Sequence, residues 1–146
     1  MFLSKKEIQE LVKKKIEELH EAINKLQEQT IPYTSLPHPR TFKLLNENVK
    51  IVWPGQPKDW YGVKVGEHIF RLGLENNHIA NMICEACKYQ PAKILRVIRR
   101  IDAATEWCKR RTEGRKRAVE EILKQQKKAV DALTALAVAY KLTRSP

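Results

Sequence analysis

The sequence lacks the features of a membrane protein or an exported protein. No apolar run approaches the roughly 18 residues that a membrane-spanning helix needs. The opening stretch MFLSKKEIQE has only Phe2 and Leu3 before its charged residues begin, so we expect no signal peptide. The three cysteines are an odd number, which is typical of free thiols in a reducing compartment. We therefore expect a cytoplasmic protein that has no membrane partner.

The sequence also lacks a recognisable catalytic constellation. Its five glycines form no phosphate-binding loop and no dinucleotide-binding fingerprint, and none of its three serines stands in a nucleophile-elbow pattern. The carboxylates between residues 47 and 75 form no pair of the kind that holds a metal. These absences predict a protein that is not an enzyme and that needs no cofactor.

Positive charge is abundant and unevenly distributed. The net charge of +11 is built from zero over residues 1–30, +2 over residues 31–75 and +9 over residues 76–146. A charge asymmetry of this kind predicts a polyanionic or acidic partner for the C-terminal half. Nucleic acid and an acidic protein are the two main candidates, and a small phosphorylated ligand bound between protomers is a third.

Residues 1–30 predict an amphipathic helix with a defined start. Ser4 and Glu7 form a capping box, in which each side chain satisfies a free backbone N–H of the first turn. Apolar residues then follow at spacings of four and three, as in the seam of a coiled coil: Val12, Ile16, Leu19, Ile23 and Leu26. Such a helix needs a partner for its apolar face.

The middle of the chain predicts an arm followed by a small sheet. Residues 31–47 begin with three prolines in twelve residues, so we expect an extended arm. Residues 48–74 contain the alternating stretches NVKIVW and YGVKVGEHIFRLG, the second with a tight turn at Gly66-Glu67. This pattern predicts an antiparallel meander of about three strands, with PGQPKD as a connecting turn.

Residues 75–146 predict a basic helical region. Asn76 or Asn77 is the expected cap of a first helix, and Pro91 either stops that helix or begins the next one. At 100° per residue, two later groups of apolar residues fall on one arc. These are Ile94, Val97, Ile98, Ile101, Ala104 and Cys108, then Val119, Ile122, Leu123, Val130, Leu133, Ala137 and Tyr140.

Between these two groups the same arc holds Thr112 and Arg115, and Gly114 lies beside them. A continuous helix of about fifty residues would be roughly 75 Å long, which implies an oligomer or a long coiled coil. The alternative is a helical hairpin that breaks near Thr112–Gly114. Because the apolar stripe lapses where the glycine occurs, we expect the break.

Together these segments predict a single domain over residues 1–146. The expected fold class is α+β and mostly α, with a long N-terminal helix, a small meander and two or three C-terminal helices. The coiled-coil-like N-terminal seam and the alanine-rich stretch AVDALTALAVAY carry more apolar surface than a three-stranded sheet can cover. We therefore expect a homo-oligomer.

One face of the C-terminal helical region carries the candidate functional residues. Guanidinium groups suit bidentate phosphate contacts, and an indole among them can stack on a base. The acidic residues of this region lie together at one flank of that face, where we expect them to leave the arginines unpaired. The alternatives for the indole are burial against the sheet or the N-terminal helix, or contact with a protein partner. The expected site consists of Arg96, Arg99, Arg100, Trp107, Arg110 and Arg117.

Two further groups of residues have possible roles in binding. The candidate zinc ligands are His78, Cys84, Cys87 and Cys108. A single C-x-x-C inside an amphipathic helix favours buried thiols instead. The loop VWPGQPKDWYG gathers Trp53, Trp60 and Tyr61, which we expect to close a small core. The sequence as a whole predicts a non-enzymatic nucleic-acid-binding protein, or else a module that docks on an acidic protein.

Overall fold

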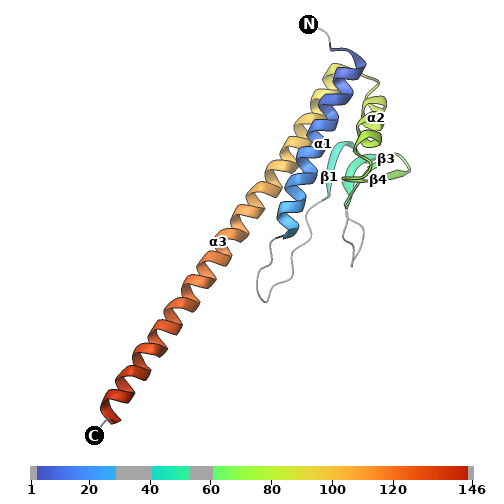
Figure 1. Cartoon of the computed structure of the whole chain (residues 1–146). Helices are drawn as coiled ribbons and strands as arrows, with labels where there is room; N and C mark the ends of the chain where they lie inside the picture. The colour runs from blue at the N-terminus through green and yellow to red at the C-terminus, as the bar shows by residue number, and fades with distance from the viewer. Residues whose placement is uncertain (1–2, 29–40, 53–60, 145–146) are drawn as a thin grey trace.

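The computed structural model describes residues 3–28, 41–52 and 61–144, with side chains up to Lys141. These residues confirm an α+β, mostly helical fold (Figure 1). The elements in chain order are α1 (Lys5–Glu28), β1 (Phe42–Asn46), β2 (Val49–Val52), β3 (Gly62–Val65), β4 (His68–Arg71), α2 (Asn76–Ala86) and α3 (Pro91–Arg144). Residues 31–40 of the expected arm and the PGQPKD turn lie outside the described residues.

The start of α1 and its apolar face confirm the prediction from the sequence. The Glu7 backbone N–H donates to Ser4 Oγ at 3.1 Å, and the Ser4 N–H lies 3.5 Å from Glu7 Oε1, which completes the capping box. All five residues of the predicted seam, from Val12 to Leu26, are buried. They belong to a single core that α1, α2, the sheet and the first half of α3 share.

The sheet has four antiparallel strands in the order β1-β2-β3-β4, one more than expected. The additional strand, β1, lies in the part of residues 31–47 that we expected to be an extended arm. It pairs with β2 across a two-residue turn, where the Asn48 N–H donates to Asn46 Oδ1 at 2.9 Å. The predicted turn at Gly66-Glu67 is confirmed, because β3 and β4 pair across it and Gly66 has a φ of +63°.

Helix α2 begins differently from the prediction. Its N-cap is Glu75, which makes no side-chain cap bond, so the expected asparagine cap is wrong. The Asn76 side chain instead accepts from the Gly73 N–H at 2.9 Å and so stabilises the preceding turn. Past the end of α2, Lys88 and Tyr89 adopt left-handed φ values of 51° and 53°. The chain then re-enters a helix with Pro91 as its first residue, one of the two roles predicted for it.

Helix α3 is continuous for 54 residues, so the predicted break near Gly114 is wrong. The residue that interrupts the apolar arc, Arg115, is only 6% exposed, and its guanidinium donates to the Leu26 carbonyl oxygen at 3.2 Å. Its aliphatic stem therefore continues the packed surface, while its charged end satisfies one of the last four carbonyls of α1. Gly114 is exposed and needs no positive φ.

The two long helices run side by side in the same direction (Figure 1). Lys15 of α1 forms an ion pair with Asp102 of α3 at 3.1 Å, and Leu26 meets Arg115 further along both helices. Helix α1 ends at Glu28, whereas α3 continues for about 29 further residues, or roughly 43 Å at 1.5 Å per residue. Of the described side chains from Lys116 to Lys141, none is buried. We call this part of α3, from Lys116 to Arg144, the tail.

Candidate polyanion-binding surface

The arginines predicted from the sequence lie on the side of α3 that α1 leaves free. Their neighbours on the opposite side of the helix, Val97, Ile101 and Ala104, are buried in the core. Helix α3 as a whole carries fifteen basic and six acidic residues. The structure brings together five exposed guanidiniums on one side of α3: Arg96, Arg99, Arg100, Arg110 and Arg117.

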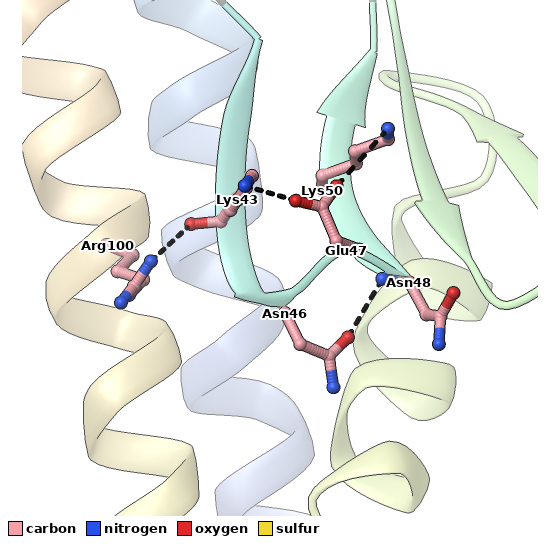
Figure 2. Close-up of polar contacts among 6 residues, drawn as sticks. All are labelled: Lys43, Asn46, Glu47, Asn48, Lys50 and Arg100. Carbon is pink, nitrogen blue, oxygen red and sulfur yellow. Dashed lines mark hydrogen bonds and ion pairs between the residues drawn. The ribbon is translucent and has the colours of Figure 1, made fainter.

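Arg100 connects this side of α3 to the sheet. Its Nη1 donates to the backbone carbonyl oxygen of Lys43 at 3.1 Å, so the guanidinium lies against the edge strand β1 (Figure 2). An edge strand presents unpaired backbone groups, and here one of them accepts a charge-assisted bond. The arginine side of α3 and strand β1 are therefore adjacent parts of one surface.

Trp107 packs on the protein rather than standing free among the arginines. Its ring is half-buried and meets Phe42 of β1 edge to face, with centroids 5.6 Å apart and planes at 69°. The Arg111 guanidinium lies 5.7 Å from the same ring. This position favours the alternative in which the indole is buried against the sheet over a role in base stacking.

A row of lysines across the sheet was not found from the sequence. Lys43 of β1 lies opposite Lys50 of β2, and Lys50 lies opposite Lys64 of β3. Their neighbours Leu44, Ile51 and Val63 point into the core, so the three lysines lie on the outer face of the sheet. We call Lys43, Lys50 and Lys64 the lysine row. A signal for it exists in the sequence, because each strand contains a lysine between two apolar residues, in FKL, VKI and VKV.

Glu47 is the carboxylate that balances the lysine row. It forms an ion pair with Lys43 and lies 4.0 Å from Lys50, as Figure 2 shows. The hydrogen bond with Lys43 lowers the pKa of Glu47 below its ordinary value, so the carboxylate stays ionised at neutral pH. Like charges on opposite residues of neighbouring strands destabilise a sheet, and one carboxylate offsets only part of the charge of three lysines.

We expected the acidic residues of α3 to leave all of its arginines unpaired, but one of them, Glu106, pairs with an arginine. Glu106 lies 3.7 Å from Arg110 one turn later, and Asp102 pairs with Lys15 of α1. The side chains of Arg110 and Glu106 are 81% and 56% exposed, so their ion pair contributes little to stability. Arg110 therefore remains available to exchange Glu106 for a stronger anion.

The three thiols lie in the core. Cys84, Cys87 and Cys108 are fully buried, and burial raises the pKa of Cys84 and of Cys108 to about 11. His78 is exposed and stacks on Phe70, with ring centroids 6.5 Å apart. Within the part of the chain that the structure describes, no three His, Cys, Asp or Glu side chains lie close enough together to hold a metal ion.

Of the predicted aromatic cluster, Trp53 and Trp60 lie outside the described residues, and Tyr61 is half-buried. Burial raises the pKa of the Tyr61 phenol, and Tyr61 lines a polar pocket of about 280 Å³ together with His20, Asn24 and Gln27 of α1. The arginine side of α3 contributes no residue to the lining of this pocket. The alternative of a small phosphorylated ligand bound between protomers stays a prediction, because it involves a second copy of the chain.

Neither the helices of the structure nor three comparisons with known proteins identify a partner for this surface. None of the helices in the described ranges is both long enough and apolar enough to cross a lipid bilayer. No protein-family model, no curated protein and no solved structure matches this chain.

Proposed function

We propose that this protein binds nucleic acid without catalysis, through phosphate contacts made by a basic surface. This basic surface joins the five exposed arginines of α3 to the lysine row of the sheet. It is the lysine row that carries the proposal, because its three cations are held opposite one another on the outer face of the sheet. Phosphates bound there would relieve the repulsion that the free protein bears.

The dimensions of the basic surface suit a nucleic acid. From Arg96 to Arg117 the helix rises about 32 Å, close to the roughly 34 Å of one turn of B-form DNA. Guanidiniums and ammoniums along such a length match a regular line of phosphates, and Trp107, the aromatic residue among these arginines, is half-buried and packs on Phe42. We therefore expect weak sequence preference and a steep dependence on salt. The buried, protonated thiols are compatible with action in a reducing compartment such as the cytoplasm.

The test is a binding isotherm for random-sequence duplex and single-stranded oligonucleotides of about 30 nucleotides, measured over a salt series. The variant Arg96→Gln/Arg99→Gln/Lys64→Gln removes three cations that make no ion pair among the described residues. If all three contact phosphates of duplex DNA, the slope of log K against log salt falls in magnitude by about 2.7, at roughly 0.9 per contact.

A matched control separates position from total charge. The variant Lys6→Gln/Lys14→Gln/Lys25→Gln loses the same three charges from exposed positions of α1. It should keep most of the affinity and most of the slope. Absence of binding at low salt, or an equal loss in both triple variants, would contradict the proposal and favour an acidic protein as the partner.

A further inference from the structure

The tail of α3 exposes a side that is mostly apolar. Its large apolar residues are between one half and two thirds exposed: Leu123 57%, Val130 60%, Leu133 67%, Leu136 66% and Tyr140 58%. Isolated apolar residues are common on protein surfaces, but several large apolar residues exposed along one side of a helix mark an interaction site.

This side continues an interface that already exists within the molecule. Along the first half of α3, positions spaced by four and three residues from Ile94 to Arg115 lie on the side of the helix that packs against α1. The same spacing continues without a shift into the tail. We call these tail positions the tail seam: Val119, Ile122, Gln126, Ala129, Leu133, Leu136 and Tyr140.

We propose that a second copy of this chain occupies the tail seam, with the two tails antiparallel. The positions that flank the seam carry no charge from residue 118 to residue 139, namely Ala118, Leu123, Gln125, Val130, Ala132, Ala137 and Ala139. In an isologous dimer the same surface of both copies forms the interface, so charged flanks of one sign would repel each other. Uncharged flanks avoid this repulsion and suit self-association. An acidic partner would require cations beside the seam, but the nearby lysines, Lys124, Lys127 and Lys128, lie on the other side of the helix.

The position of α1 determines the direction of pairing. In a parallel pair, each α3 would have to continue along the seam of its partner on the N-terminal side of Arg115, where the end of the partner's own α1, at Leu26, already packs against Arg115. Because α3 is straight and unbroken, it cannot bend away from that collision (Figure 1). In an antiparallel pair, α1, α2 and the sheet of each copy (its body) lie beyond the C-terminal end of the partner's tail.

One antiparallel register brings complementary positions of the seam together. It places Ile122 opposite Tyr140 of the second copy, Gln126 opposite Leu136 and Ala129 opposite Leu133, so that at the centre of the overlap the small Ala129 faces the large Leu133. In this register the Arg144 of the second copy is level with Ala118, one turn short of the α1 contact at Arg115. The lysines at 124, 127 and 128 then lie beside the nearly uncharged residues 132–140 of the other copy, whereas parallel tails would bring them level with one another.

The first test is the mass of the intact chain in solution, measured by light scattering between about 1 and 100 µM. We expect a dimer of twice the 17.0 kDa chain mass. The variant Leu133→Lys/Leu136→Lys places two charges in the seam and should weaken dimerisation by at least about 100-fold. Val138→Lys is the matched control, since Val138 is 51% exposed on the opposite side of the helix and should leave the dimer intact.

The second test determines direction by disulfide formation between single-cysteine additions. Chains with Gln126→Cys and chains with Leu136→Cys should form a mixed disulfide when combined under oxidising conditions, because these positions are opposite in the antiparallel register. Each variant alone should not crosslink, since its own two copies lie about 15 Å apart along the axis. The three native cysteines are fully buried and do not compete.

The same measurements can overturn the proposal. A monomeric mass at 100 µM would exclude the second copy as the occupant and leave a different protein for that role. A dimer that persists in Leu133→Lys/Leu136→Lys, with helix content unchanged by circular dichroism, would exclude the tail seam. Self-crosslinking of either single variant would show that the tails are parallel.

Discussion

Lysines on opposite residues of neighbouring strands destabilise a sheet, because the short cross-strand distance makes their two ammonium groups repel each other. In this protein the lysine row is tolerated with the help of Glu47, which contacts two of its three members. The carboxylate therefore competes with any phosphate that approaches the same ammonium groups. This competition makes Glu47 a sensitive position for testing the function of the basic surface.

We predict that Glu47→Gln strengthens nucleic-acid binding and makes it more dependent on salt. Once the carboxylate is gone, the lysines it contacts are free to pair with phosphate, and the magnitude of the slope against log salt should rise by up to about 0.9 per additional contact. The measurement is the binding isotherm of the variant beside that of Glu10→Gln, which removes the same charge from an exposed position on α1. A loss of affinity in Glu47→Gln, or an identical gain in both variants, would count against a binding role for the lysine row.

Two single residues show where prediction from the sequence stops. The helical projection correctly grouped Trp107 with the arginines of α3, but the same arc includes Arg100, which faces the edge of the sheet. Phe42 belongs to a strand that the sequence concealed within a proline-rich arm, so the partner of the indole could not be identified in advance. Burial of Trp107 was one of the alternatives, and only the position of β1 distinguishes it from exposure.

At the scale of elements, helix α3 shows that a lapse in an apolar stripe is not always a turn. The sequence signals for a break were Gly114 and the presence of Thr112 and Arg115 in the core arc. A glycine inside a helix costs only about 1 kcal/mol relative to alanine, which is too little to overcome packing on both sides of it. The arginine supplies that packing through its stem and a hydrogen bond to the end of α1.

Two alanine substitutions of glycine should therefore have opposite effects on the free energy of unfolding. Gly114→Ala should raise it by about 0.5–1 kcal/mol, because the position is helical and a methyl group there meets nothing within 4 Å. Gly66→Ala should lower it by about 1–2 kcal/mol, because the φ of +63° in that turn is costly for a residue with a side chain. Urea unfolding followed by circular dichroism measures both, and destabilisation by Gly114→Ala would argue that the helix is not continuous there.

At the scale of the whole molecule, the packed part of the protein covers only one end of the long helix α3. The core of α1, α2 and the sheet packs against only the first half of α3, and the tail extends beyond it (Figure 1). Antiparallel tails would put the two bodies at opposite ends, with their basic surfaces facing solvent. The proposed dimer therefore has two separated binding surfaces for a polyanion.

Small-angle X-ray scattering should distinguish the possible shapes by maximum dimension. Overlap of two 54-residue helices from Ala118 to Arg144 gives a dimer of about 120 Å at 1.5 Å per residue. The Leu133→Lys/Leu136→Lys variant, as a monomer with an unbroken α3, should measure about 80 Å along the helix. A maximum dimension near 45 Å for that variant would indicate that α3 folds back in solution.

The sequence by itself determined the features that depend on neighbouring residues. These are the capping box and buried seam of α1, the β3–β4 turn and the arc that holds the arginines, because helix periodicity and turn chemistry act over a few positions. The tertiary structure alone decided features that join distant segments. Only strand register puts Lys43, Lys50 and Lys64 in one row, and only the contact of Arg115 with α1 shows why α3 continues through Gly114. Both depend on the positions of residues that are distant in the chain, which local sequence patterns do not encode.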